Sequence, residues 1–526
     1  MLKPITKNEV NEFIVLDYYI TLIQEGKINF LSNRPHYGVK VITSIKQLKA
    51  SNDMHSRIQS AKELWKLLFE ASMTFIDPDK TGYDELFAFF DKFVDFEELI
   101  FASDSFYRDH TLHVLWVYFL GEYLYYQDDF AVLTKNYKET YDTILDQLAV
   151  IEKMDRNKQF ESVHKVKEGV MKTNENKSAC RCLAALTHDL GYPVKKIGKV
   201  NKAIKEVLPF FGIHSFDEFE FRYNLEQKQF IEGFITFLGL KIEVNLKWDD
   251  PKAKEILNDV NGETLTVDDL RTKTFTDEEL TILAEHLINE YIIQSSHKKV
   301  MEYAKNFEGF QHGIMSAYLL LRTLPAFSSI GWEYSGDAYK VKPHTVKIDD
   351  LFSKTSILAA ITNHTNENYR ITSIDDESSF LTFMDELEEF SRISRANQSC
   401  SYVEEFCRTK LFMNGDWFQI DFIFDNQGIE GLDPERAFKG RCKRFLRLFD
   451  VPNMSEDLKI KLNCIGELQY DQSTYSLEIA RNHARITIDG EQKDIPKYLK
   501  SSEFYTTEEY NAIGQLHTNI HSQSAS

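Results

Sequence analysis

The sequence predicts a mainly helical protein, and three observations support that fold class. Glycine (22 of 526 residues) and proline (11) are scarce, whereas phenylalanine (39) and tyrosine (25) are frequent. Hydrophobic residues make up 43% of the chain, enough to fill a substantial core. Apolar residues recur at helical spacing in several long segments, while strand-like alternation is confined to short stretches. This combination favours helices over a β-rich sandwich or barrel.

The chain is long enough for several domains, and its pattern changes at three places. We predict an N-terminal helical region (1–100), a central helical domain (101–395) with an insertion (about 199–300), a small α+β domain (400–500) and a flexible tail (507–526).

Within those regions the apolar spacing predicts individual elements. Expected helices cover Ala61–Glu70, Tyr83–Phe96, Leu112–Tyr126, Ala179–Leu190, Gly313–Leu324, Ser356–Asn363, Phe380–Ser394 and Glu435–Leu448. Expected strands cover Glu218–Arg222, Lys241–Leu246, Trp417–Phe424, Leu458–Cys464, Thr474–Ala480 and Ala484–Asp489. Two charged stretches, Met154–Lys177 and Lys247–Asp277, are predicted to be a linker and a surface loop.

Charge and cysteine content limit the classes of function. A net charge of −20 argues against an extended nucleic-acid surface. The sequence has no apolar run of about eighteen residues and no apolar leader, so we expect a cytoplasmic protein without a membrane partner. The six cysteines lack the C-x-x-C pairs of zinc sites and are expected to be reduced thiols. A homo-oligomer remains possible.

The most informative segment surrounds His188 and Asp189. These two residues end an apolar, small-residue helix, and Gly191 follows as a helix terminator. Adjacent residues on a helix point about 100° apart, so they converge only at a helix end or on a shared ion. A neutral imidazole beside a carboxylate suits a divalent metal that accepts mixed nitrogen and oxygen ligands.

Five further candidate ligands lie at or inside otherwise apolar helical segments: His110, His113, His312, His364 and Asp385. Burying such groups without partners is costly, and a shared metal would satisfy all of them. His110 and His113 lie three residues apart and therefore on one helix face, so either could be the first ligand.

Taken in order, these residues resemble the HD-domain superfamily of metal-dependent phosphohydrolases. That family carries a histidine, a His-Asp pair, two further histidines and a closing aspartate on separate helices of an all-α bundle. The corresponding residues, within about 105–395, are His113 (followed by Val117 and Gly121), His188-Asp189, His312 (with Ser316-Ala317), His364 (after Ala359-Ala360-Ile361) and Asp385. The chain departs from the family after the His-Asp-x-Gly run, where many relatives have lysine and this sequence has Tyr192-Pro193.

The resemblance implies two divalent transition-metal ions bridged by Asp189. His113, His188 and Asp385 would hold one ion, and His312 and His364 would complete the other; Fe, Mn, Co, Ni and Zn all suit this set. The implied activity is hydrolysis of a nucleotide or another small phosphate ester by a metal-activated water, with Asp189 and His110 as catalytic residues. Four basic residues are expected to bind the substrate phosphate: Arg108, Lys195, Lys196 and Arg392.

Two other functions stay open. One is a di-iron oxygenase of the same fold, similar to myo-inositol oxygenase; the other is a regulatory protein that senses a ligand at the HD site. In the second case the α+β domain would signal through its basic helix, which carries Arg436, Lys439, Arg441, Lys443, Arg444 and Arg447. That helix is either a solvated face balancing nearby acids or a face that binds an anion or partner. If the domain is separate, a chain ending near Ser399 should keep the metal site.

Overall fold

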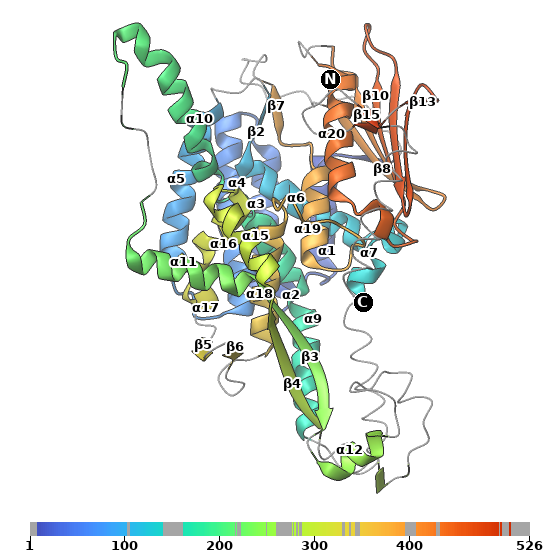
Figure 1. The fold of residues 1–526 in the computed structure, drawn as a ribbon. Helices are drawn as coiled ribbons and strands as arrows, with labels where there is room; N and C mark the ends of the chain where they lie inside the picture. The colour runs from blue at the N-terminus through green and yellow to red at the C-terminus, as the bar shows by residue number, and fades with distance from the viewer. Residues whose placement is uncertain are drawn as a thin grey trace.

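The computed structural model describes residues 8–505, apart from 102–105, 140–160, 216, 218–221, 249, 259–275, 277, 280–281, 283–286, 329–331, 336–337, 342–347, 395–406, 428–431, 494 and 497–503. A large helical body carries a seven-stranded sheet on one side (Figure 1). The predicted combination of a mainly helical chain and a smaller C-terminal sheet is confirmed. The predicted tail lies outside the described residues.

The N-terminal region is helical, as expected. It contains α1 (Glu12–Gln24), α2 (Asn29–Ser32), α3 (Pro35–Ala50), α4 (Met54–Ile76) and α5 (Tyr83–Phe101). Trp65 of α4 stacks on Phe90 of α5, with 3.7 Å between ring centroids. The indole N–H of Trp65 also donates to the carbonyl of Leu186 at 2.7 Å. The N-terminal helices are thereby fixed to the segment that ends in His188 and Asp189.

Five helices form the centre of the body: α6 (His110–Tyr126), α9 (Glu161–Thr187), α16 (His312–Thr323), α18 (Ile348–Asn363) and α19 (Glu377–Leu387). Asp109 caps α6 by accepting from the N–H of Leu112 at 3.0 Å, and Asp376 caps α19 in the same way. The predicted linker Met154–Lys177 is wrong from Glu161 onward, because α9 already begins there. Once the apolar half of a helix is formed, each further residue adds a backbone bond at little cost, so a polar stretch can continue it.

The remaining elements of this part of the chain lie between α6 and α18 in the sequence. They are η1 (Asp128–Phe130), α7 (Ala131–Lys138), α10 (Tyr192–Val207), η2 (Leu208–Phe211), α11 (Leu225–Leu238), β3 (Leu240–Trp248), α12 (Pro251–Asn258), β4 (Leu287–Ser295), α15 (His297–Glu308), α17 (Pro325–Ser328), β5 (Trp332–Ser335) and β6 (Ala338–Val341). β3 and β4 form an antiparallel ribbon, which confirms the strand predicted at Lys241–Leu246. The surface loop predicted at Lys247–Asp277 is wrong in two places. β3 continues to Trp248, and α12 occupies Pro251–Asn258. The strand predicted at Glu218–Arg222 lies, except for Arg222, outside the described residues.

The sheet has the strand order β1-β8-β9-β10-β11-β12-β13. Its members are β1 (Glu9–Val10), β8 (Arg408–Asn414), β9 (Trp417–Phe424), β10 (Ile460–Gly466), β11 (Thr474–Ala480), β12 (His483–Ile488) and β13 (Glu491–Lys493). Only the pair β9 and β10 is parallel among these neighbours, and α20 (Pro434–Leu448) and η3 (Val451–Asn453) lie in the connection that such a pair requires. β14 (Ile495–Pro496) and β15 (Phe504–Tyr505) form a separate pair. β1 was not predicted, because two residues are too few to show alternation.

The end of α19 differs from the prediction. The helix expected at Phe380–Ser394 ends at Leu387, and β7 (Arg392–Ser394) then pairs with β2 (Phe106–Arg108). The Glu388 carboxylate accepts from the backbone N–H of Ser391 at 2.8 Å and from its hydroxyl at 2.7 Å. These side-chain bonds stabilise a turn in place of further helix. The turn brings the start of α6 and the end of α19 together.

The sheet and the helical body share one continuous hydrophobic core. In Figure 1, α20 lies between the sheet and the helical body, close to α19. Phe383 of α19 packs edge-on against Phe418, Phe445 and Phe449, with ring centroids 5.7 to 6.4 Å apart. In the described part of the chain, no helix is both long enough and apolar enough to cross a membrane.

Candidate metal centre

Five side chains meet around the carboxylate of Asp189 in the interior of the helical body. The Nε2 atoms of His312 and His364 lie 3.2 and 3.6 Å from Asp189 Oδ1. The Nε2 atoms of His188 and His113 lie 3.4 and 3.7 Å from Asp189 Oδ2. His113 Nε2 is also 2.9 Å from Asp385 Oδ1. The structure therefore brings all six residues that the sequence predicted as ligands into one site.

Acceptors behind the rings fix the orientation of three histidines. Nδ1 of His188 donates to the carbonyl of Ala185 at 2.7 Å, and Nδ1 of His364 donates to that of Ile361 at 2.5 Å. Nδ1 of His113 contacts the Glu388 carboxylate at 2.5 Å. A neutral imidazole has only one N–H, so the Nε2 lone pairs of His188 and His364 point toward Asp189. Among the described residues, neither of these buried Nε2 atoms has a hydrogen-bond partner.

The charge states make this arrangement unfavourable without a cation. Burial lowers the pKa of His188 to about 4, even though the Asp189 carboxylate acts in the opposite direction. Burial also lowers the pKa of His312. Burial acts to raise the pKa of Asp189, but the surrounding histidines, His188 foremost, hold that pKa well below its ordinary value. The neutral imidazole of His188 thus directs a lone pair toward an ionised carboxylate, and a positive ion between the two would satisfy both.

The donor set and its spacing fit a metal. Two ligands that each lie about 2.0–2.2 Å from one ion are separated by roughly 3.0–3.6 Å at ordinary coordination angles. The ligand-atom pairs given above are 2.9 to 3.7 Å apart. Two groups, each with three donor atoms in mutual reach, could hold an ion: His113, His188 and Asp385, and His188, Asp189 and His364. Four imidazoles and two carboxylates suit a divalent transition metal.

Two glycines and a serine explain how separate helices come this close. A Cβ on Gly191 would lie 2.3 Å from the carbonyl oxygen of His312, so only glycine allows the turn after Asp189 to pack on α16. A Cβ on Gly313 would lie 2.4 Å from the carbonyl oxygen of Ile361, so only glycine at this position lets α16 pack this closely on α18. The Ser316 hydroxyl donates to the His188 carbonyl at 2.6 Å and accepts from the Gly191 N–H at 2.7 Å.

His110 lies beside the six residues in a different role. Its Nδ1 contacts Glu97 Oε2 at 2.6 Å, and its Nε2 lies 3.9 Å from Asp189 Oδ2. His113, not His110, is close to Asp385, which favours His113 as the first ligand. Glu97 and Glu388 were not predicted. Glu388 follows Asp385 by three residues, a spacing that could have placed it beside the predicted ligand. No comparable feature of the sequence linked Glu97 to the site.

Tyr192 lies beside two histidines of the site. Its ring lies 3.9 Å from that of His110 and 5.1 Å from that of His312 between centroids. The side chain of His312 is 21% exposed, whereas those of His113, His188 and His364 are at most 1% exposed. The site is therefore least buried on the side of His312 and Tyr192.

The four predicted phosphate-binding residues lie at two places. Lys195 is exposed and donates to Gln311 at 2.9 Å, next to His312. Lys196 is buried, with its ammonium 4.6 Å from the centre of the Tyr192 ring. Arg108 and Arg392 stand opposite each other in the β2–β7 pair. Their side chains lie outside the described part of the structure.

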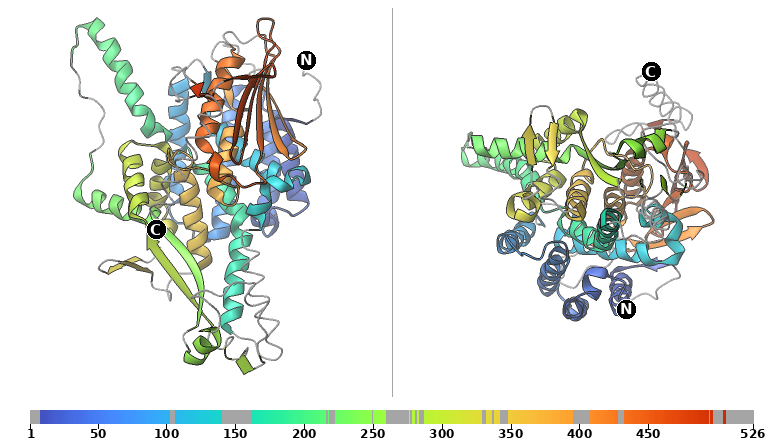
Figure 2. Two further views of the ribbon diagram at one scale, coloured as in Figure 1. Left: turned by 45° about the vertical axis from the view of Figure 1, so that its right-hand side comes forward. Right: turned by 90° about the horizontal axis from the view of Figure 1, so that it is seen from below.

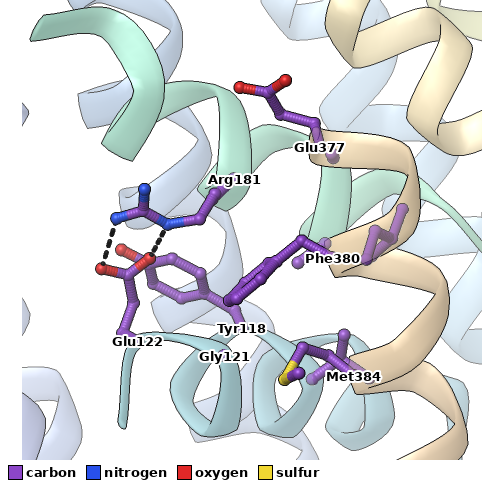
Figure 3. A pocket seen from close by; sticks show the side chains of 11 residues that line it. Tyr118, Gly121, Glu122, Arg181, Glu377, Phe380 and Met384 are labelled. Carbon is purple, nitrogen blue, oxygen red and sulfur yellow. Dashed lines mark hydrogen bonds and ion pairs between the residues drawn. The ribbon is translucent and has the colours of Figure 1, made fainter. Parts of the chain in front are cut away.

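A small cavity adjoins the site between α6, α9 and α19, one turn along each helix from the candidate ligands (Figure 3). It has room for about one water molecule. Arg181 and Glu122 at its wall form two hydrogen bonds of 2.6 and 3.0 Å (Figure 3). The Arg181 guanidinium also lies 3.8 Å from the centre of the Tyr125 ring. This ion pair is satisfied within the protein and stabilises the contact between the two helices.

No family model, curated protein or solved structure matches this chain. The residues and geometry of the site are therefore the basis for assigning a function.

Proposed function

We propose that this protein is a metal-dependent phosphohydrolase or phosphodiesterase of the HD type, acting on a nucleotide or another small phosphate ester. The observation that carries the proposal is the inward direction of the unpaired Nε2 atoms of His188 and His364 toward the ionised Asp189. A bound cation would satisfy this arrangement. The six residues lie on or directly after five helices, and their order resembles that of the HD superfamily.

The site residues would divide the ions as the resemblance implies. His113, His188 and Asp385 would hold one ion, His312 and His364 would hold the second, and Asp189 would lie between them. A bound divalent ion would supply activation of water and counter-charge for a phosphoryl oxygen. Fe, Mn, Co, Ni and Zn all accept this donor set.

Other residues would handle the proton and the substrate charge. His110, which contacts Glu97 on one side and lies 3.9 Å from Asp189 on the other, would move a proton at the reacting centre. Lys195 and Lys196 lie at the start of α10, beside the open side of the site, where they would attract a phosphate group.

Metal analysis combined with a hydrolysis screen tests the proposal. The full chain, purified without chelator, should contain transition metal and release phosphate or nucleoside monophosphate from at least one member of a nucleotide panel without oxygen. Asp189→Asn should lose both metal and activity. The matched control is His214→Ala, which removes an exposed histidine and should keep both.

The same experiment separates the two alternatives. Oxygen uptake with a polyol or a phosphonate, without anaerobic hydrolysis, would replace the hydrolase with a di-iron oxygenase. Nucleotide binding with neither reaction would indicate a ligand sensor. A protein that contains no metal, or an Asp189→Asn variant with unchanged metal content, would remove the basis of all three.

A further inference from the structure

An exposed apolar tip stands at the end of α10. Four of the ten large hydrophobic side chains that are exposed in the described residues fall within 207–213: Val207 (53% exposed), Phe210 (90%), Phe211 (75%) and Ile213 (44%). Figures 1 and 2 show α10 projecting beyond the helical body and ending at this tip. Water contact over two phenylalanine rings is unfavourable, so this segment is suited to an apolar surface outside the chain.

The helix that leads to the tip is amphipathic. Ile197, Val200, Ile204 and Leu208 follow one another at spacings of three and four residues and therefore share one side. All four are only half-buried. The first part of α10 packs on α16 and α5. Its apolar side is thus incompletely covered by the described part of the chain and is continuous with the tip.

The same helix is basic in an acidic protein. Between Tyr192 and Phe211 the sequence has a single acidic residue, Glu206, and five lysines: Lys195, Lys196, Lys199, Lys202 and Lys205. Lys202 and Lys205, the two nearest the tip, are exposed. Lys202 lies 3.9 Å from Glu206, an exposed pair that leaves its ammonium accessible to other anions. In a chain with net charge −20, these lysines give the end of α10 a local attraction to an anionic surface.

We propose that the tip of α10 docks this protein onto a membrane surface that contains anionic lipid. Phe210 and Phe211 would enter the headgroup region, while Lys202 and Lys205 would contact lipid phosphates. A lipid interface accepts two projecting rings without a preformed pocket, and a lysine-bearing amphipathic helix with aromatic residues is the kind of segment that binds there. This revises the expectation of no membrane partner, which considered only segments that span a bilayer.

The docking is independent of the proposed hydrolase. α10 has 16 residues and begins three residues after Asp189. A helix of that length rises about 24 Å, so the tip lies far from the metal centre along the helix axis. Loss of metal should therefore leave docking unchanged, and loss of docking should leave hydrolysis of a soluble substrate unchanged.

Vesicle flotation of the full chain tests the proposal. The wild type should float with phosphatidylcholine vesicles that contain phosphatidylserine and not with phosphatidylcholine alone. Phe210→Ser with Phe211→Ser should reduce the partition coefficient by roughly tenfold or more, because the apolar contact is lost. Lys202→Glu with Lys205→Glu should reduce it at low salt. Val39→Ser, which alters an exposed apolar residue on α3, is the matched control and should bind as the wild type does.

Three results would overturn the proposal. One is a wild-type protein that floats equally well with both vesicle types, or with neither. Another is flotation that survives the paired phenylalanine substitution. The third is a wild-type dimer, seen by light scattering, that dissociates on that substitution while the wild type shows no flotation, since a second copy would then cover the tip. Asp189→Asn should float normally, which separates this proposal from the metal site.

Discussion

Glu388 shows how the site depends on residues behind the ligands. Its carboxylate is fully buried and contacts Nδ1 of His113 and the backbone N–H and hydroxyl of Ser391. A carboxylate in this position fixes the ring of a ligating histidine and raises its basicity. The same side chain ends α19, so one residue would couple the shape of the helix end to the strength with which His113 binds a metal.

Replacement of Glu388 should weaken metal binding without removing a ligand. We expect Glu388→Gln to lower metal affinity about 10–100-fold, measured by competition with a chromogenic chelator. Glu386→Gln is the control, since Glu386 lies on the same helix but pairs with the half-exposed Arg444. Unchanged affinity in Glu388→Gln would show that His113 needs no support from this carboxylate.

The two histidines of α6 should respond differently. His113→Ala should lose metal, because His113 lies 2.9 Å from Asp385. His110→Ala should keep metal and lower turnover by roughly 10²–10⁴-fold, the usual contribution of a proton-transfer group. Metal content and single-turnover rates check both. The reverse pattern, with metal lost only in His110→Ala, would exchange their roles.

Asp109 should make the free energy of unfolding depend on pH. Burial raises its pKa from 3.8 to about 6, with the Glu97 carboxylate acting in the same direction. A raised pKa means that the folded state binds the proton more tightly, so this contribution to stability is present below about pH 4 and lost as pH rises through 6. Asp109→Asn keeps an acceptor for the Leu112 N–H and removes the charge. It should be more stable than the wild type above pH 7, by on the order of 2–3 kcal/mol, and this difference should shrink below pH 6. Urea unfolding of metal-free protein at pH 8 and pH 5 measures this, and a difference independent of pH would contradict it.

At the scale of elements, α20 is held against α19 by opposite charges. Arg441 of α20 donates to Glu389 at 2.9 Å, and both are buried. The Arg441 guanidinium also lies 4.0 Å from the centre of the Phe422 ring. Arg444 and Arg447 pair with Glu386 and Glu367 at more exposed positions. Three arginines of the basic helix thus pair with acids of the same chain, as one of the two interpretations expected, but Arg441 does so in the interior and not on a solvated face.

The buried and exposed arginines of α20 should differ in their effect on stability. Arg441→Ala leaves a buried carboxylate without this partner and should lower the free energy of unfolding by about 3–5 kcal/mol. Arg444→Ala, which removes a half-exposed pair, should cost about 1 kcal/mol or less. Denaturant unfolding of the two variants checks the contrast. Equal effects would show that Arg441 is not important for holding α20 against α19.

The shared core also predicts the outcome of removing the sheet. A chain that ends after Ser399 would expose Phe383 and leave Glu389 without Arg441. We therefore expect that truncation to be insoluble or to contain no metal, contrary to the idea of a separable signalling domain. A soluble, metal-loaded product would show that residues 400–500 fold and act separately, which remains the predicted division of the chain.

At the scale of the whole molecule, the sequence identified residues better than boundaries. The six candidate ligands could be predicted because each is a polar group in an apolar segment and their order is distinctive. The early start of α9 could not, because a polar stretch continues a helix without showing a face. β1 and the turn at Glu388 depend on contacts with residues hundreds of positions away or on side-chain bonds, neither of which local periodicity shows.

The separation of His113 and Asp385 by 272 positions has a consequence during synthesis. At about 5–20 residues per second, a ribosome needs roughly 15–50 s to pass from the first of these residues to the last. Throughout that interval the nascent chain has His113 but no complete binding site. Loading of a metal at this site would therefore follow synthesis of most of the polypeptide, and β1 waits still longer for β8, its partner in the sheet.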